Sequence, residues 1–169
     1  MDYSYIAGFT DGDGSFEFTI RHKHKGKYSW WEPQFSYKLQ QKTAHGENAV
    51  KCVAEFLKAD GIAVCLYPRR TKYKGSGYKS TELRITSKKA LKVFVSRIVD
   101  KLIVKKHQAE VFLQLLTEVE KLPRRGLGGK KFTIQVCASL LEKWEPVRLR
   151  KSMNRTWSSE RLLSLSRLS

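Results

Sequence analysis

Cysteine is scarce in this sequence of 169 residues and follows no pattern. The three cysteines, Cys52, Cys65 and Cys137, are odd in number and scattered. A zinc site or a disulfide framework requires closely spaced, paired cysteines, so the sequence argues against both. We expect three buried, reduced thiols.

Long hydrophobic segments are also absent, because no run reaches the roughly 18 apolar residues that a membrane-spanning helix requires. The N-terminus has neither the apolar core of a secretory signal nor the Arg- and Ser-rich start of a transit peptide. We therefore expect a soluble intracellular protein that binds no membrane. Its compartment is an organelle (chloroplast or mitochondrion) or a prokaryotic cytoplasm, and the sequence does not distinguish these.

Acidic residues are few, with 16 against 33 basic ones, which gives a net charge of +17. Such an excess in a chain of this size indicates a polyanionic partner, with nucleic acid as the leading candidate. A non-specific basic surface, as in ribosome-associated or membrane-surface proteins, is the alternative. The apolar content of 41% is that of a globular protein, and we predict one domain over residues 1–169.

Residues 5–18, YIAGFTDGDGSFEF, combine a short helix with the start of a strand. Gly8 and Gly12 are four residues apart and therefore share one face of the helix. Ala7 and Asp11 have the same spacing, so this face carries almost no side chain. A second helix can approach such a face closely, and we predict a helix–helix contact through these four residues.

Asp13 lies where the helical pattern changes to a period of two. A carboxylate at the C-terminal end of a helix faces the negative end of the helix dipole and the last unpaired carbonyls. This position is unfavourable unless a cation compensates, so we predict a divalent metal ion at Asp13.

A first hairpin is predicted after this helix. Phe16, Phe18 and Ile20 alternate with polar residues, and a second strand with the same alternation follows a turn at residues 26–33. We expect Trp30 and Trp31 to be exposed in that turn, with core packing as the alternative. The polar face carries side chains that hydrogen-bond base edges and phosphates. Its predicted nucleic-acid contacts are Glu17, Thr19, Arg21, Lys23, Lys25, Lys27, Trp30, Gln34, Ser36, Lys38 and Gln40.

A second basic hairpin is predicted after a helix that begins at Gly46 and ends at Asp60. Its strands flank a Gly-Ser-Gly turn at residues 75–77, and residues 69–79 contain five cations and no acid. Leu83 and Ile85 are expected to point inward. The predicted nucleic-acid contacts of this hairpin are Arg69, Arg70, Lys72, Lys74, Lys79, Glu82 and Arg84.

The remainder of the chain has helical periodicity. The predicted segments are 87–102, capped by Ser87; 105–122; 132–144; and a last short helix capped by Ser158. A glycine-rich connector at 123–129 and a basic linker at 146–155 join them. The order is helix, two strands, helix, two strands and then helices, which predicts an α+β fold.

Other acidic and glycine-rich motifs do not fit. Counted from Asp11, an EF-hand requires Gly and Glu where Phe16 and His22 stand. An Asp-x-Asp phosphatase site would follow a buried strand of a doubly wound sheet, and that alternation is missing here. Residues 126–130 lack the first glycine of a phosphate loop.

Residues 5–14, YIAGFTDGDG, resemble the signature motif of the LAGLIDADG homing endonucleases, and the order of elements is similar to that family over residues 1–122. The resemblance implies an αββαββα core with a saddle-shaped antiparallel DNA-binding sheet, followed by C-terminal helices and a basic tail over 123–169. The motif occurs once. Members of the family with one copy act as homodimers, so a homodimer of the intron-encoded kind is implied, and a two-fold axis would pair the bare helix faces.

The resemblance also implies roles for single residues. Asp13 and the backbone carbonyl of Gly12 would bind Mg²⁺; the same sites would accept Mn²⁺ or Ca²⁺, the latter without catalysis. Gln41 corresponds to the family's water-positioning Gln, and Lys105 to its transition-state Lys. Asp11 is assigned to packing or capping.

The register of two of these residues is open by one position, because Gln40 and Lys42 flank Gln41, and Lys106 follows Lys105. His45 is a weaker candidate for supporting the solvent network. The strand alternation places Gln40 with Lys38 on the face predicted to meet nucleic acid, and Gln41 at the end of the strand.

The predicted function is a sequence-specific double-strand DNA endonuclease that hydrolyses phosphodiester bonds at a long pseudo-palindromic site. An intron RNA maturase, which would bind host intron RNA with the same basic surface, is the alternative. A transcription regulator is less favoured, because the sequence has no separate helix-turn-helix.

Overall fold

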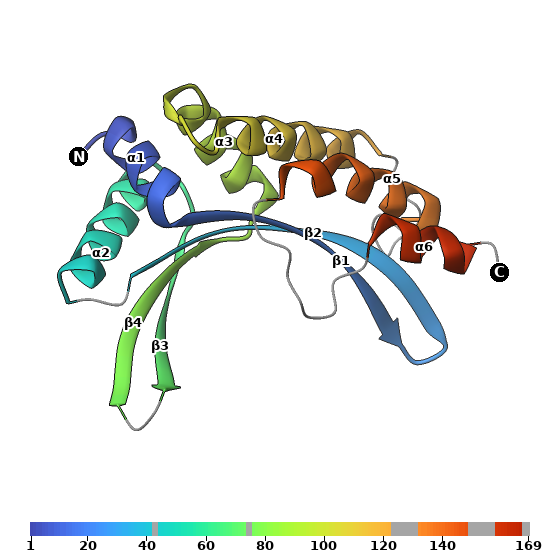
Figure 1. The fold of residues 1–169 in the computed structure, drawn as a ribbon, viewed down its shortest axis with the longest axis horizontal. Coiled ribbons are helices and arrows are strands. Elements are labelled where there is room, and N and C mark those ends of the chain that lie inside the picture. Colours follow the sequence, from blue (N-terminus) through green and yellow to red (C-terminus); the bar gives the residue numbers. More distant parts are fainter. Residues whose placement is uncertain (42–43, 74–75, 123–131, 149–157, 167–169) are drawn as a thin grey trace. The chain divides into compact units, whose positions relative to one another are not determined.

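The computed structural model describes residues 1–41, 44–73, 76–122, 132–148 and 158–166. The fold is of the predicted α+β class, in the predicted order of elements (Figure 1). The elements are α1 (Tyr3–Asp13), β1 (Gly14–Lys25), β2 (Tyr28–Gln41), α2 (Ala44–Ala59), β3 (Cys65–Tyr73), β4 (Ser76–Ile85), α3 (Lys88–Ile98), the 3-10 turn η1 (Val99–Lys101), α4 (Lys106–Lys121), α5 (Ile134–Trp144), the 3-10 turn η2 (Glu145–Val147) and α6 (Ser159–Ser166).

The four strands form one sheet in the order β1-β2-β4-β3, so the second strand of each hairpin lies in the middle. The register across β2 and β4 pairs Tyr37 with Ile85, Lys38 with Arg84, Leu39 with Leu83, and Gln40 with Glu82. Directly opposite residues of an antiparallel pair share a face. The apolar pairs therefore point to one side of the sheet and the polar pairs to the other.

The chain divides into two compact units, and both hairpin strands β1 and β2 contribute to each. The first unit comprises Met1–Glu17 and Ser36–Ala109, and the second comprises Phe18–Phe35 and Glu110–Ser169. The organisation as one domain over residues 1–169 stays a prediction.

In the first unit, α1 and α3 cover the apolar face of the sheet (Figure 1). Tyr37 is fully buried, with its ring centroid 4.6 Å from that of Phe94 and 5.5 Å from that of Phe16. Leu39 and Leu83 are fully buried beside them. These inward residues are the ones that the period-two alternation predicted.

In the second unit, aromatic residues make the core. Phe18 lies 4.8 Å from Phe35 and 6.2 Å from Trp144 between ring centroids, and Phe35 lies 5.4 Å from Phe112. The apolar stripes of α4 and α5 supply Phe112 and Trp144, as their helical periodicity predicted.

The first hairpin turn differs from its prediction. It consists of Gly26 and Lys27 alone, and Gly26 has a positive φ of 58°, a conformation that glycine adopts without steric cost. Strand β2 therefore begins before the tryptophans. Trp30 is half-buried, but Trp31 is only 8% exposed and stacks on His22 at 4.3 Å between ring centroids. The expectation of exposure was wrong for Trp31, because the inward alternation of β2 continues through it.

The cysteines also differ in part from their prediction. All three are free thiols, but only Cys137 is buried, and burial raises the pKa of its thiol to about 12. Cys52 lies on α2 beside the buried stripe that includes Val53, and Cys65 begins the edge strand β3. Both are exposed, because neither position is covered by a neighbouring element.

Helix capping follows the sequence. The side chain of Ser87 accepts a hydrogen bond from the amide of Ala90, and Ser158 accepts one from the amide of Arg161 at 3.2 Å. The connector at 123–129 lies outside the described residues, as do residues 149–155 of the predicted basic linker. No helix within the described ranges has the length and apolar character needed to cross a bilayer.

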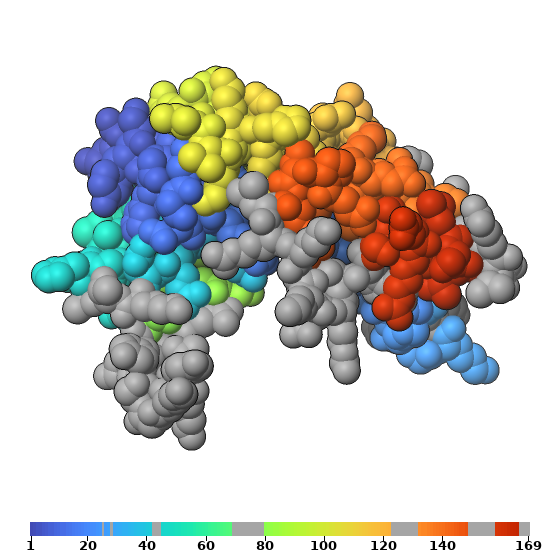
Figure 2. Space-filling model, in the orientation of Figure 1, coloured from blue at the N-terminus to red at the C-terminus, as the bar shows by residue number. Residues whose placement is uncertain are grey.

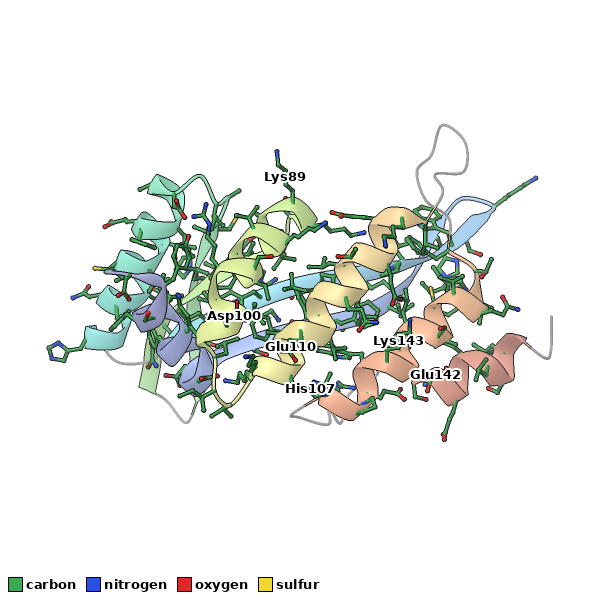
Figure 3. The ribbon with its side chains drawn as sticks, turned by 90° about the horizontal axis from the view of Figure 1, so that it is seen from above. Lys89, Asp100, His107, Glu110, Glu142 and Lys143 are labelled. Atoms are coloured by element: carbon green, nitrogen blue, oxygen red, sulfur yellow. The ribbon has the colours of Figure 1, made fainter. Side chains whose placement is uncertain are left out.

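Several charged side chains lie on the solvent side of the helices, among them Lys89, Glu142 and Lys143 (Figure 3). Lys89 of α3 and Glu142 of α5 are exposed, and Lys143 of α5 forms an ion pair with Glu118 of α4 at 2.7 Å. Exposed pairs of this kind contribute little to stability.

Candidate functional site

The site is built on the junction between α1 and β1, which has no loop. The backbone N–H of Gly14 caps α1 by donating to the carbonyl of Thr10, and β1 starts at Gly14 itself. A Cβ atom on Gly14 would lie 2.8 Å from the Cα of Thr10 and 2.9 Å from its carbonyl oxygen. Only glycine permits this approach, which accounts for the last glycine of the motif.

Lys105 places a positive charge at this end of α1. The side chain is buried, and its Nζ donates to the carbonyls of Thr10 and Asp11, each at 2.7 Å. Carbonyls at a helix C-terminus carry partial negative charge, so a lysine ammonium is stabilising there. The dipole argument predicted a cation at this helix end, and Lys105 supplies one. The case for a metal at Asp13 therefore rests on the exposure and donor chemistry of that carboxylate.

Asp11 holds the segment that carries Lys105. Its carboxylate accepts hydrogen bonds from the amides of Ile103 at 2.7 Å and of Lys105 at 2.9 Å, one on each oxygen. In Figure 2 the surface of α1, in blue, adjoins the yellow surface of this segment. Both carboxylate oxygens of Asp11 thus accept backbone hydrogen bonds, which is the kind of packing role predicted for this residue.

Asp13 and Gln41 meet at the exposed end of the helix. Asp13 is the last residue of α1, Gln41 is the last residue of β2, and the Nε2 of Gln41 donates to Oδ2 of Asp13. The neighbouring Gln40 points to the opposite face and donates to the Oγ of Ser80 at 2.9 Å. Strand alternation thus brings Gln41, and not Gln40, to the predicted metal ligand.

The second register question concerns Lys105 and Lys106. Lys105 is buried against the helix end, whereas Lys106 is exposed in the first turn of α4. Lys42 lies outside the described residues. His45 is exposed in the first turn of α2.

Two buried hydroxyls lie beneath the site, and the sequence reasoning missed both. The Oγ1 of Thr10 and the OH of Tyr37 share a hydrogen bond of 2.8 Å, and Thr10 also donates to the carbonyl of Ile6. Burial raises the pKa of Tyr37, and the negative charge of Asp13 raises it further, against the effect of the Thr10 bond. Tyr37 therefore stays protonated. The sequence could have indicated the burial of Tyr37, because the alternation of β2 places this residue on the inward face.

The donor set at the helix end suits a hard divalent cation. Asp13 offers an exposed carboxylate, and the carbonyl of Gly12 follows directly after the two that Lys105 occupies. Mg²⁺ is commonly held by one or two carboxylates, by waters and by substrate phosphates. Among the described residues, no three His, Cys, Asp or Glu side chains cluster to form a site made of protein side chains alone.

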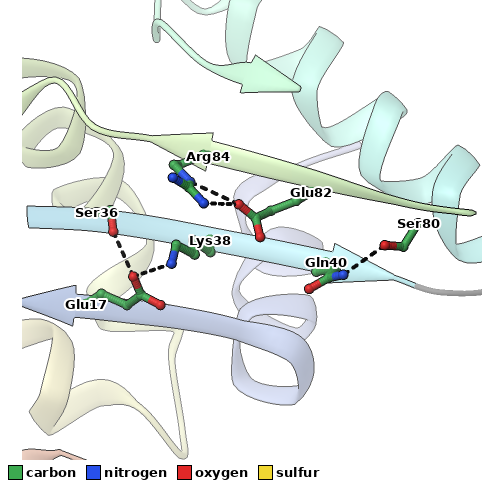
Figure 4. A network of polar contacts seen from close by, with 7 residues as sticks. All are labelled: Glu17, Ser36, Lys38, Gln40, Ser80, Glu82 and Arg84. Atoms are coloured by element: carbon green, nitrogen blue, oxygen red, sulfur yellow. Dashed lines mark hydrogen bonds and ion pairs between the residues drawn. The ribbon is translucent and has the colours of Figure 1, made fainter. Parts of the chain in front are cut away.

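The polar face of the first unit, formed by Glu17, Ser36, Lys38, Gln40, Glu82 and Arg84, carries the predicted nucleic-acid contacts (Figure 4). Glu17 accepts a hydrogen bond from Ser36 at 3.1 Å and pairs with the Nζ of Lys38 at 2.5 Å. Lys38, Ser36 and Glu17 thus stand on this face as predicted, and the acid pairs with the lysine.

Glu82 requires a correction, because it was predicted to be an exposed contact and is only 3% exposed. Alternation places it on the polar face as expected, but the guanidinium of Arg84 pairs with its carboxylate. Arg84 itself lies over the ring of Tyr67, with 5.2 Å between Cζ and the ring centroid.

The remaining predicted contacts fall into two groups. In the second unit Thr19, Gln34 and Trp30 are half-buried, Arg21 and Lys27 are exposed, and Lys23 pairs with Glu32. Other positions lie in strands, but their side chains are outside what the structure describes, and Lys74 is outside the described residues altogether. Those strand positions are Lys25, Arg69, Arg70, Lys72 and Lys79.

The predicted helix-contact face of α1 is partly corrected. Gly8 and Gly12 are exposed, and a Cβ atom on either would meet nothing within 4 Å. Ala7 is fully buried in the chain's own core, since it lies beside Ile6 on the inward side of α1, so it is not available to a partner. Tyr5 is 52% exposed on the same helix.

Two exposed apolar residues that the sequence reasoning missed extend this surface. Ile103 is 88% exposed and Val104 is 69% exposed, in the segment that Asp11 holds against the end of α1. The sequence could have indicated them, because Ile103 and Val104 are two adjacent apolar residues in a segment that connects two predicted helices. Exposed apolar side chains beside a bare helix face are typical of an interaction surface.

Several solved structures have a similar fold. The homing endonuclease I-CvuI in complex with its target, in the presence of 2 mM Ca, has a TM-score of 0.70 and 18% identity, over 98% of this chain and 93% of that chain. The archaeal intron-encoded homing endonuclease I-Vdi141I, complexed with DNA, has a TM-score of 0.65 and 17% identity, over 96% and 92%. I-GzeII, in complex with its DNA target, has a TM-score of 0.59 and 15% identity, over 98% of this chain and 49% of that chain. At these identities the likeness is one of fold.

No curated protein sequence matches the chain. The family model described as LAGLIDADG endonuclease, however, matches residues 6–114, which is more than half of the chain. The match includes Asp13, Gln41 and Lys105, the three residues that the fold brings to the end of α1. The chain therefore belongs to the LAGLIDADG endonuclease family.

Proposed function

We propose that this protein is a divalent-metal-dependent, sequence-specific double-strand DNA endonuclease that acts as a homodimer. The observation that carries the proposal is the meeting of Asp13 and Gln41 at one exposed helix end. This end lies on the same strands, β1 and β2, that carry the polar face. An intron RNA maturase would use such a face without requiring a carboxylate and an amide at this position, so we favour the nuclease.

The reaction is hydrolysis of a phosphodiester bond: a water oxygen bonds to phosphorus and loses a proton, while the bond from phosphorus to one deoxyribose oxygen breaks and that oxygen takes up a proton. Mg²⁺ held by Asp13 and the carbonyl of Gly12 would activate the water and stabilise the leaving oxygen. Mn²⁺ or Ca²⁺ would occupy the same ligands. In support of divalent-metal use, I-CvuI was solved with its target in the presence of 2 mM Ca and with the I-CreI target in the presence of 2 mM Mg, the latter with the DNA not cleaved.

The chain's own residues then have distinct tasks. Gln41 accepts or donates hydrogen bonds to orient the attacking water beside Asp13. Lys105 fixes the last turn of α1 through two carbonyls and places a positive charge near the phosphate that is cut. Asp11 keeps Lys105 in place through the backbone.

The homodimer is proposed from the exposed face of α1. Gly8 and Gly12 leave space for the backbone of a second helix, and Tyr5, Ile103 and Val104 would be covered by a partner. The lengths of the similar structures support this. The chain spans 93% of I-CvuI but only 49% of I-GzeII, so the I-GzeII chain has room for two such units, which a dimer of this chain would supply. An isologous contact would bring two metal sites to one duplex and select a pseudo-palindrome about two helical turns long.

The cleavage experiment begins with a binding site selected from a randomised duplex library, which is then incubated with the protein and Mg²⁺. We expect double-strand cleavage that requires the metal, and a loss of about 100-fold or more in Asp13→Asn with binding retained. Asp100→Asn, the same change at an exposed residue of η1, should cleave normally. Binding by the wild type without metal-dependent cleavage would contradict the enzyme proposal, and selection of structured RNA over duplex DNA would favour the maturase.

The dimer is tested by the mass in solution. We expect twice the chain mass for the wild type and one chain mass for Gly8→Leu, whose new side chain starts in open space and does not strain the folded chain. Lys89→Leu, at an exposed position of α3, should remain dimeric. A wild type of one chain mass would rule out the dimer.

A further inference from the structure

The carboxylate of Glu82 is buried in the middle of a surface that is otherwise suited to bind an anion. Its side chain is only 4% exposed, and the residue lies on the central strand β4, in register with Gln40 of β2 and Tyr67 of β3. A buried charge is destabilising unless it is paired and hydrogen-bonded. The sheet therefore needs a fixed cation beside Glu82.

Arg84 is that cation, and two sets of contacts fix its orientation. It lies two residues further along β4 on the same face, and its Nε donates to Oε1 of Glu82 at 2.9 Å, with Nη2 donating to the same oxygen. The ring of Tyr67 lies under the guanidinium at 5.2 Å. The Nε edge is thereby turned toward Glu82, and the Nη1 end of the planar group is turned away from it.

The other acid on this face is placed differently. The side chain of Glu17 is 37% exposed and bridges Ser36 and Lys38 on the two strands of the first hairpin. A lysine ammonium is a flexible point charge, whereas a guanidinium is a rigid fork that matches two acceptors at once. Of the two acids on this face that the structure describes, Glu82 is thus the one that holds a guanidinium in one orientation.

We infer that Arg84 reads a guanine in the major groove and that Glu82 is the positioning residue that aims it; this rests on the proposed DNA-binding function. An arginine fork pairs with the O6 and N7 acceptors of guanine, which are the groove pattern of that base alone. A side chain that is already held in one rotamer loses less conformational freedom on binding. Glu82 itself makes no base contact, in contrast to its prediction from the sequence.

Charge explains why this pair contributes selectivity more than affinity. Glu82 and Arg84 together carry no net charge, so they add little to the counterion release that drives binding to any phosphate backbone. Exposed lysines such as Lys27 in the hairpin turn do the reverse, since they neutralise phosphates without reading the sequence.

The test begins with wild-type protein, a randomised duplex library and Ca²⁺ in place of Mg²⁺. We expect a guanine preference at one position of each half-site. Arg84→Ala and Arg84→Lys should lower the preference at that position by about 5- to 150-fold, and Arg84→Lys, which keeps the charge, should leave the salt dependence unchanged. Glu82→Gln should weaken the same preference and raise the affinity for duplexes of any sequence.

A second measurement leaves the protein intact. Replacing the preferred guanine by 7-deazaguanine removes the N7 acceptor, and wild-type affinity should fall while the affinity of Arg84→Ala stays the same. Lys27→Ala is the matched control, and it should weaken binding to all sequences alike and reduce the salt slope by about 1. Thermal melting of each variant shows that it is folded.

The outcomes separate the inference from the proposed function. If the wild type selects no duplex sequence, the proposed function and the inference both fail. If the wild type selects a site, but 7-deazaguanine has no effect, or Arg84→Ala weakens all sequences alike as Lys27→Ala does, the inference alone is overturned.

Discussion

The end of α1 and the polar face of the sheet both contain partly buried charges, but they are held by different partners. At the end of α1, Lys105 donates to two backbone carbonyls and Asp11 accepts from two backbone amides. On the polar face, acidic side chains pair with other side chains, as in Glu17–Lys38 and Glu82–Arg84. Backbone groups are present whatever the sequence, whereas a side-chain pair depends on both of its residues.

The difference separates a fixed site from an adjustable surface. The charges of Lys105 and Asp11 are bound to the backbone and hold the last turn of α1, which carries the predicted metal ligand Asp13, as long as the fold is kept. Charges bound to side chains can be exchanged in pairs without disturbing the sheet, since strand alternation alone sets their face. The proposed cleavage site should therefore tolerate few substitutions, and the proposed recognition face many.

The strongest test of this difference is Lys105→Met, which keeps the apolar stem and removes the ammonium. Two carbonyls at the helix end lose a charged donor, so we expect unfolding free energy to fall by about 2 to 4 kcal/mol. Urea denaturation measures this. Lys106→Met, at the exposed neighbour, should change stability by less than about 0.5 kcal/mol. Equal losses of unfolding free energy in Lys105→Met and Lys106→Met would show that the bonds from Lys105 to the backbone do not stabilise the helix end.

Asp11→Ala should have the next largest effect. The amides of Ile103 and Lys105 lose their acceptor, and we expect a loss of about 1 to 3 kcal/mol in unfolding free energy. Hydrogen exchange of these two amides reports the site directly, and both should exchange faster. Asp100→Ala is the control, and unchanged exchange in Asp11→Ala would contradict the anchoring role.

Tyr37→Phe removes a hydrogen bond that lies beneath the site but holds no charge. The expected loss is about 1 kcal/mol, because Thr10 keeps its bond to the carbonyl of Ile6. A double-mutant cycle with Thr10→Val isolates the shared bond. Additive effects of the two substitutions would show that the hydroxyls do not stabilise one another.

Glu17→Gln should have the smallest effect on stability. Its side chain is 37% exposed, and exposed ion pairs contribute roughly 0 to 1 kcal/mol. Thermal melting should therefore scarcely change, while affinity for mixed-sequence duplex DNA should rise, since Lys38 is released from its acid. A loss of stability as large as that of Asp11→Ala would blur the difference between the two regions.

Much of the fold followed from local patterns. The alternation of Phe16, Phe18 and Ile20 predicted the inward face of β1, and the hydroxyl of Ser87 predicted the start of α3. The first turn was predicted over residues 26–33 because this segment contains Gly26 and Pro33, two residue types that are common in turns. In the structure Pro33 is a buried residue of β2, and two residues suffice for the turn.

The site was predictable in its residues but not in its contacts. The motif pointed to Asp13, and the family resemblance pointed to Gln41 and Lys105, but the bond from Lys105 to Thr10 joins groups 95 residues apart. Local sequence carries no information on such a pairing. The burial of Glu82 is partly of this kind: Arg84 stands two residues away on the same strand, but Tyr67 comes opposite Glu82 only once β3 and β4 are paired.

The close approach of Gly14 to Thr10 has a mechanical consequence. No loop separates the helix from the strand, so Asp13, the last residue of α1, is bonded directly to Gly14, the first residue of β1. A duplex that tilts β1 must displace the carboxylate with it. Under the proposed function, a movement that aligns the strand on DNA would also move the carboxylate relative to the bond that is cut.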